Sequence, residues 1–423
     1  MVEKSAVSSA RPVMTRNTDG PVDRTASGRP TSARIAGRIE VVDGLRFLAA
    51  LMVVTFHLIA LPKAWNAPPE ELFPVLRLPA AYGWLGVELF FLVSGFVICM
   101  SSWGRSLGDF FVSRVARLYP AYLFGILATT GVLVLVADGL ERLSIKDILM
   151  NLTMLQEPLG ARHVDGVYWT LWVELRFYLL FSVVVWRGLT YRRAVAFCFV
   201  WAAAAVLMSQ ADNGPLKHLV MPDYCWYFIA GIGFYLMYRF RPTLLLTLMV
   251  VGSFLAAHQS TLRRQGTAEK YLGTQIPEWP TTMLVAAFFI VMALIATGRL
   301  SWIRGKWLVV AGALTYPLYL LHENIGWEVI GVFEGDIPAL LLVSVLVAAL
   351  LLASWLVHRL IERPGTRWLR THLRAAVLEA RTGLAEVDNR SRREDQAPSS
   401  TAGPTTVAGD VTVAERPAAT GVS

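Results

Sequence analysis

The stretch DGLRFLAALMVVTFHLIAL, residues 43–61, is the first long apolar run and can cross a bilayer as a helix. It carries two ionisable side chains, Arg46 and His57, which lie eleven positions apart. At about 100° per residue this spacing is three turns plus roughly 20°, so both side chains project from one helix face. An ionisable group in hydrocarbon costs roughly 3 kcal/mol or more and usually faces a partner or cavity. The run therefore predicts a fixed cation with a base deeper in the membrane, although a snorkelling arginine and a core histidine would give the same pattern.

The composition indicates a polytopic membrane protein. Hydrophobic residues make up 55% of the 423 residues and charged ones only 17%, where about 25% is usual in soluble proteins. The net charge of +8 resides mostly in arginines of the tails and short loops, which favours topology signals and anionic lipid over nucleic acid. Cys99, Cys198 and Cys225 show no CxxC spacing, so neither a disulfide framework nor a zinc site is expected.

Ten apolar runs predict an all-α bundle of about ten transmembrane helices. They lie near residues 44–62, 84–103, 119–137, 168–186, 193–209, 223–238, 242–257, 281–297, 307–322 and 338–357. The even number places both termini on one side. Short loops rich in arginine on that side predict a cytoplasmic location for both termini, in a multi-pass protein of the plasma membrane. One expected outer loop, with Arg263, Arg264 and Lys270, departs from this rule.

The two tails lack the composition of a folded core. Residues 1–38 are rich in Ser, Thr, Pro and Arg and predict a disordered cytoplasmic tail before a membrane domain over residues 39–366. In the tail 367–423, residues TRWLRTHLRAAVLEA predict a short amphipathic helix on the inner surface. Disorder is expected after about residue 384.

Further polar residues interrupt the apolar runs. In the second run, Glu88 and Ser94 accompany Gly86 and Gly95, which allow a neighbour to approach closely. Simple packing or an interfacial carboxylate would explain the same residues. Glu174 lies among aromatics in the fourth run and predicts either a partner for an arginine or a group that orients a histidine.

Basic and aromatic residues mark the ends of other runs. Arg114 and Arg117 lie three apart before Pro120; they are either topology determinants or ligands for the phosphates of a donor. Trp169 either belongs to an interfacial aromatic belt or lines a substrate cavity. His322 and Glu362 close the ninth and tenth runs.

Taken together, these stretches resemble the acyltransferase-3 family of integral membrane acyltransferases. The resemblance covers roughly residues 39–366. The matching segments are DGLRFLAALMVVTFH with Asp43, Arg46 and His57; GVELFFLVSGF with Glu88 and Ser94; SRVARLYPAY with Arg114, Arg117 and Pro120; WTLWVELRFYL with Trp169 and Glu174; TYPLYLLH with Tyr316, Tyr319 and His322; and IERP with Glu362. Ser113 departs from the family pattern, in which a second basic residue is common.

The resemblance implies transfer of an acyl group, usually acetyl from acetyl-CoA, to a hydroxyl of a carbohydrate or glycosylated acceptor, without a metal. Surface polysaccharides and secreted natural products are the acceptor classes that it suggests. On residue chemistry, His57 is the predicted general base, with Glu174 or Glu88 as its orienting carboxylate. Arg46 would hold the donor or stabilise negative charge on the thioester oxygen, and Arg114 and Arg117 would bind the CoA phosphates. Direct transfer and an acyl-histidine intermediate are both compatible with the sequence. A proton-coupled transporter or flippase of a related glycan is the alternative.

Overall fold

The computed structural model describes residues 39–136, 143–211 and 214–396. Across these ranges the secondary structure is helical and no strand is formed. Nine helical segments in the described ranges are long and apolar enough to span a membrane, and a shorter apolar helix covers Lys306–Leu321. The all-α polytopic class predicted from the apolar runs is therefore confirmed. The predicted disorder of residues 1–38 and 397–423 falls outside the described residues.

Ten helices follow the ten apolar runs, and the ninth of them is the shorter apolar helix. They are α1 (Glu40–Thr55), α4 (Gly86–Ser102), α5 (Leu107–Val136), α7 (Trp169–Trp186), α8 (Tyr191–Ser209), α10 (Cys225–Phe240), α11 (Leu244–Leu272), α12 (Glu278–Ala296), α13 (Lys306–Leu321) and α15 (Ala339–Val357). Short helices occupy the connections: α2 (Pro69–Leu72), α3 (Arg77–Ala81), α6 (Ile145–Asn151), α9 (Pro215–Val220) and α14 (Asn324–Phe333). Leucines and valines are exposed along the outer helices, as a surface that faces lipid requires.

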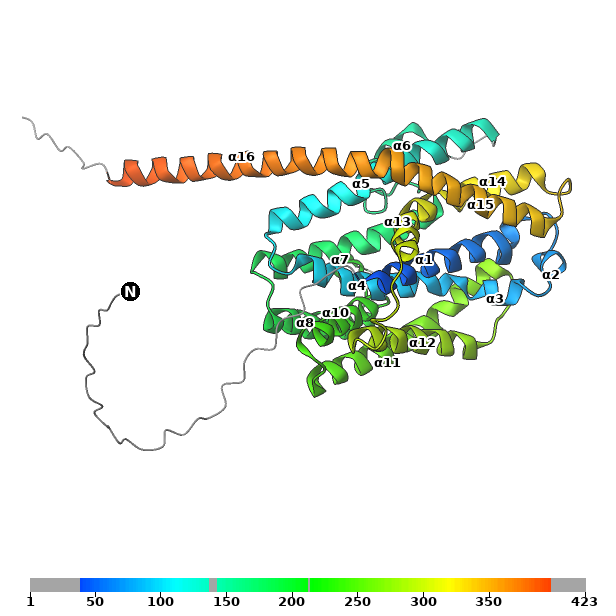
Figure 1. Ribbon diagram of the computed structural model, residues 1–423, viewed down its shortest axis with the longest axis horizontal. Coiled ribbons are helices and arrows are strands. Elements are labelled where there is room, and N and C mark those ends of the chain that lie inside the picture. Colours follow the sequence, from blue (N-terminus) through cyan, green and yellow to red (C-terminus); the bar gives the residue numbers. More distant parts are fainter. Residues whose placement is uncertain (1–38, 137–142, 212–213, 397–423) are drawn as a thin grey trace, which may run out of the picture.

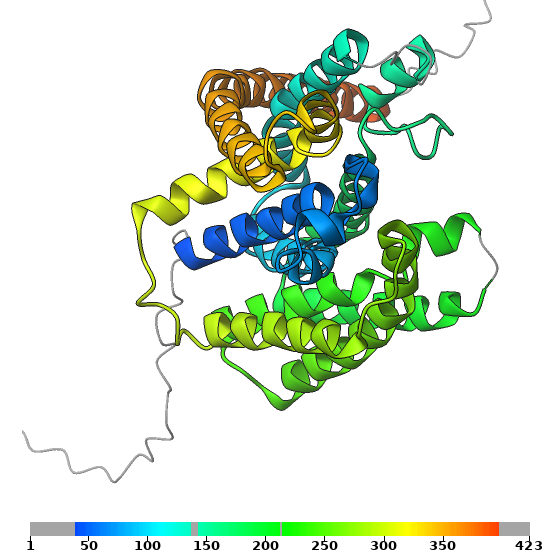
Figure 2. The same ribbon diagram turned by 90° about the vertical axis from the view of Figure 1, so that its right-hand side faces the viewer.

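The helices α1 and α4 form the centre of the bundle. Figure 2 shows α5, α14 and α15 on one side of this pair and α8, α10, α11 and α12 on the other. Lipid supplies no hydrophobic drive between helices, so close backbone packing has to hold them together. Gly95 of α4 lies against the backbone of Phe228, and Gly231 of α10 lies against the backbone of Leu92; a Cβ at either glycine would clash. Gly95 in the second apolar run therefore permits the close approach of a neighbouring helix that was predicted from the sequence.

Helix α11 extends well beyond the predicted run and contains the residues that were expected to form an outer loop. Within this extension Arg264 Nη1 pairs with Glu88 Oε1 at 2.5 Å, and Arg263 Nη2 lies 3.7 Å from Asp223 Oδ1. The expectation of a loop there is wrong. Both arginines thus lie beside carboxylates on a helix and not in a loop.

The last spanning helix does not end at the membrane domain. A π-helical turn, η5 (His358–Glu362), connects α15 to α16 (Arg363–Gln396). Figure 1 shows α16 passing alongside α5 and projecting beyond the bundle. Its first turns are anchored by Gly365, which packs on Pro120, and by Arg374, whose Nε lies 3.9 Å from Asp109 Oδ1. The helix is thus longer than the short surface helix predicted, and it includes residues 384–396, where disorder was expected. The content of Leu, Ala, Glu and Arg favours this helix.

Candidate functional site

A broad basic cavity opens at the end of the bundle where α1, α5 and α13 begin and α15 ends. Its volume is about 680 Å³. Two carboxylates line it, Asp43 and Glu362, and Glu362 Oε2 lies 2.8 Å from Nδ1 of His358. The cationic lining residues come from α1, α5, α16 and the α4–α5 connection: Arg46, Arg105, Arg114, Arg117, Arg363 and Arg370. We call this cavity the arginine vestibule. Its excess of positive charge favours an anionic ligand.

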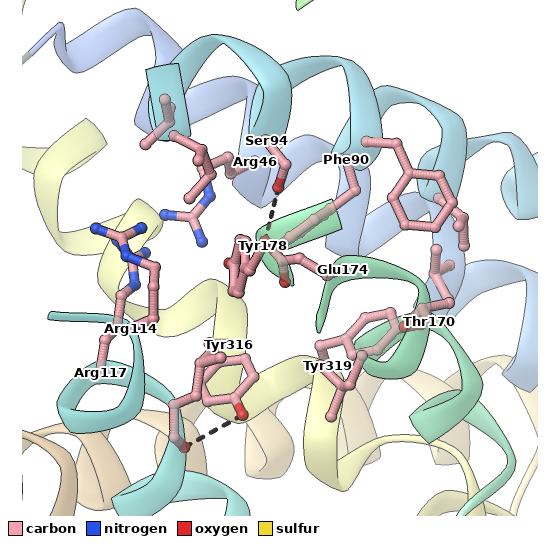
Figure 3. Close-up of a pocket in the computed structure, with 17 residues that line it drawn as sticks. Arg46, Phe90, Ser94, Arg114, Arg117, Thr170, Glu174, Tyr178, Tyr316 and Tyr319 are labelled. Carbon is pink, nitrogen blue, oxygen red and sulfur yellow. Dashed lines mark hydrogen bonds between the residues drawn. The ribbon is translucent and has the colours of Figure 1, made fainter. Parts of the chain in front are cut away.

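A narrow pocket continues from the vestibule into the core of the bundle. Its volume is about 40 Å³. The residues that line both spaces are Arg46, Val97, Arg114, Arg117 and Tyr316. Figure 3 shows the arginines at one end and Thr170 and Tyr319 at the other. A space of this volume holds only a few water molecules, so a slender chain can enter only if the lining side chains move apart, and a bulky headgroup stays in the vestibule.

The arginines at the mouth of the pocket are held in place. Arg114 is 9% exposed, and its Nε donates to Ser113 Oγ at 3.2 Å while Nη2 donates to Ser101 Oγ at 3.3 Å. Arg46 lies with its guanidinium carbon 5.4 Å from the ring centroid of Phe90. Ser113, the departure from the family pattern, thus supports an arginine instead of adding a charge.

Glu174 lies in the middle of the pocket and not beside His57. Its Oε1 accepts a hydrogen bond from Ser94 Oγ at 2.8 Å and another from Tyr178 Oη at 2.5 Å (Figure 3). Glu88 forms the ion pair with Arg264 described above. Neither carboxylate forms a described contact with His57, so the prediction that one of them orients this imidazole is wrong.

The partner of His57 is His322. His57 lies in the π-helical turn η1 (Phe56–Ala60) that continues α1. Its Nδ1 lies 2.9 Å from the carbonyl oxygen of Val53 and 3.1 Å from His322 Nε2. His322 Nδ1 lies 2.9 Å from the carbonyl oxygen of Tyr319. Because a carbonyl only accepts, each neutral ring carries its proton on Nδ1, and the single proton on His57 Nδ1 is shared between the carbonyl oxygen of Val53 and Nε2 of His322. The lone pair of His57 is then on Nε2.

The Nε2 atom of His57 faces a buried acidic pair. Glu323 Oε1 lies 3.7 Å from it. Asp165, next to Glu323, is fully buried and accepts backbone hydrogen bonds from Val167 and Asn324. Both acids flank the membrane-spanning segments. Burial raises the pKa of Asp165, an effect that nearby Glu323 reinforces, and burial likewise raises the pKa of Glu323. The pair therefore retains a proton to higher pH than an isolated carboxyl group.

The imidazole lies just beyond the deep end of the pocket. Val53 lines the pocket, and His57 follows it by one helical turn, about 6 Å along the axis. Tyr319 also lines the pocket, and its ring centroid lies 5.6 Å from that of His322. Tyr319 Oη is fixed by Thr170 Oγ1 at 2.8 Å. One layer of side chains thus separates His57 from the space that the arginines open.

The remaining predicted site residues fall into two groups. Asp43, Tyr316 and Glu362 line the vestibule, and Tyr316 Oη donates to the carbonyl oxygen of Leu118. Trp169 instead lines a separate polar cavity beside Tyr224, with the two ring centroids 5.5 Å apart.

Several residues of the site escape sequence reasoning. Asp165 and Glu323 follow no periodic apolar pattern, although Glu323 is adjacent to His322 in the sequence. Arg363 and Arg370 fall in the segment expected to leave the membrane domain. Within the described ranges no group of three or more His, Cys, Asp or Glu side chains has the arrangement of a metal site.

Comparison with known proteins agrees with this architecture. The acyltransferase-3 model, described as an acyltransferase domain, matches residues 39–359. Nodulation protein 10 of Rhizobium leguminosarum bv. viciae is 30% identical over 233 residues, 48% of this chain and 61% of that protein. Acyltransferase MdmB of Streptomyces mycarofaciens is 29% identical over 185 residues, 40% of this chain and 45% of that protein.

These alignments span only part of each relative, 61% and 45% of their lengths. No solved structure matches the chain. The family match covers most of the chain and includes α1, α4, α5, α7 and α13, which build the pocket. The chain belongs to the acyltransferase-3 family of membrane proteins.

Proposed function

We propose that the protein transfers an acyl group, acetyl in the first instance, from acyl-CoA to a hydroxyl of a carbohydrate or glycosylated acceptor. The observation that carries this proposal is the continuous path from the arginine vestibule to a pocket that ends one helical turn from His57. The printed name of the Streptomyces relative, an acyltransferase, supports the reaction class.

In this proposal the vestibule opens to the cytoplasm of a cell whose plasma membrane holds the bundle. Arg46, Arg114 and Arg117 meet the phosphate-bearing end of the donor, because guanidinium groups bind phosphate oxygens in bidentate geometry. The narrow pocket takes the slender pantetheine arm with its thioester. The acceptor approaches His57 from the opposite end of the bundle.

The chemistry follows from the tautomer of His57. Its Nε2 takes the proton of the acceptor hydroxyl while the hydroxyl oxygen bonds to the thioester carbonyl carbon. The carbon–sulfur bond then breaks, and the leaving thiolate regains a proton from the imidazolium. Glu323 stabilises the transient positive charge on His57. Arg46 precedes His57 by eleven residues, about 16 Å along the helix axis, so in this mechanism it binds the phosphate end of the donor and does not contact the thioester carbonyl oxygen.

The test is transfer of label from acetyl-CoA to a glycan acceptor by purified protein. His57→Ala is expected to lower the rate by about 10² to 10⁴, the contribution of a general base. His258→Ala is the matched control, because that histidine contacts Thr282, away from the pocket. Retained turnover in His57→Ala removes the imidazole from the mechanism. If no acceptor is labelled while a proton gradient drives glycan uptake into vesicles, the protein is a transporter instead.

A further inference from the structure

The first two turns of α16 form one wall of the arginine vestibule. Arg363, Thr366 and Arg370 line the cavity. Arg363 and Arg370 are seven positions apart, which is about two turns less 20°, so they share one face of the helix. Arg105, in the α4–α5 connection, lines the same cavity.

These three arginines are available to a ligand. Arg363 and Arg370 are exposed, and within the described ranges neither forms an ion pair. The nearest carboxylate in sequence, Glu362, is held by His358 at 2.8 Å. Unpaired cations that face one another across a cavity repel, so an anion between them is favourable.

The position of the wall is fixed by packing. Gly365 lies between the two arginines and contacts Pro120 so closely that a Cβ would clash with that ring. The turn η5 joins the wall to α15 without a loop. The backbone of α16 at these arginines is therefore held at a fixed distance from Arg114 and Arg117 on α5.

We propose that Arg363 and Arg370, together with Arg105, form a second phosphate subsite, for the nucleotide end of a CoA-type donor. The inference rests on the proposed function and deepens it. Arg114 and Arg117 stand at the mouth of the narrow pocket, and this subsite lies further out in the vestibule. A donor whose pantetheine arm enters the pocket places its nucleotide phosphates outside, beside α16. The subsite lies largely beyond the residues that the family match covers.

The experiment measures binding of CoA, dephospho-CoA and pantetheine to the purified full-length protein in nanodiscs. Arg363→Gln with Arg370→Gln is expected to weaken CoA binding about tenfold to hundredfold, the loss from removing one or two charge-assisted hydrogen bonds. Pantetheine, which has no phosphate, is expected to bind both proteins equally. Arg363→Lys with Arg370→Lys, which retains the charges, is expected to restore part of the affinity.

The matched control is Arg367→Gln compared with Arg370→Gln alone, because each variant removes one positive charge from the same helix and only Arg370 lines the cavity. If Arg367→Gln weakens CoA binding as much as Arg370→Gln, or if the effects of the vestibule variants appear only in nanodiscs with anionic lipid, the arginines serve lipid headgroups and the subsite is refuted. If wild type binds CoA and the vestibule variant binds it equally well, the subsite is refuted while the donor assignment stands. If wild type does not bind CoA, both are refuted.

Discussion

Replacement of His322 tests whether this residue positions His57 or acts in its place. His322 is fully buried, and its Nε2 accepts from His57 Nδ1 at 3.1 Å. His322→Leu fills the site with a side chain that cannot accept a hydrogen bond. His57 keeps its bond to the carbonyl oxygen of Val53, so the variant loses one of two restraints on the imidazole.

The expected effect is moderate. A neutral hydrogen bond contributes about 0.5 to 1.5 kcal/mol, which corresponds to a fall of roughly two- to tenfold in kcat. His322→Gln is expected to recover most of this loss, because its amide oxygen can accept from His57 and its amide nitrogen can donate to the carbonyl of Tyr319. His57→Ala removes the base itself and is expected to cost far more, about 10² to 10⁴.

The assay is steady-state transfer from labelled acetyl-CoA at saturating acceptor, with kcat and the KM for acetyl-CoA determined for each variant. The thermal unfolding of each purified variant reports whether the fold survives. A loss in His322→Leu as large as that in His57→Ala, with an intact fold, would refute a positioning role and make His322 the base or the acyl carrier. An unchanged rate would show that the contact between the rings does not matter.

Three further perturbations probe the surroundings of the pocket. Burial raises the pKa of Asp165 and Glu323. The stability that these two groups contribute is therefore fully present below the ordinary carboxyl pKa of about 4 and is lost as pH rises through the raised pKa values. The Tm measured in detergent should fall with rising pH, and Glu323→Gln should flatten this dependence. Gly95→Leu drives a side chain into the backbone of Phe228 and should prevent recovery of folded protein by size-exclusion chromatography, whereas an unchanged profile would contradict the packing. Glu174→Gln keeps the shape of the pocket but removes its charge; kcat should fall while the pH profile assigned to the base stays in place, and a shifted profile would return Glu174 to the role of orienting group.

The spanning helices were accessible from sequence because each satisfies its backbone internally and faces lipid. Long apolar runs therefore mark all ten, from α1 to α15. The polar second half of α11 and the helix α16 were not predicted from the sequence, because their polar composition resembles that of loops and tails. Their stability rests on partners far away in the chain, such as Glu88 for Arg264.

The functional site was likewise predicted only in part. Arg46 and His57 were placed on one helix face from their spacing alone, and Val53, which lies between them on that face, lines the pocket. The contact between His57 and His322 joins residues 265 positions apart, and no periodicity within one helix reports it. Spacing shows which face a side chain occupies, but the neighbour across that face follows from the packing of α1 on α13.

The layer formed by Tyr319 and Thr170 has a consequence for the electrical insulation of the membrane. A basic vestibule that penetrates the bundle would let water and ions enter part of the membrane thickness. The hydrogen bond between Tyr319 and Thr170 holds a layer of side chains at the deep end of the pocket, and this layer has to move aside for the proposed transfer. A layer that parts only around bound substrates would leave protons and small ions no open conduit through the bundle, so the proposed reaction would not dissipate the ion gradients of the cell.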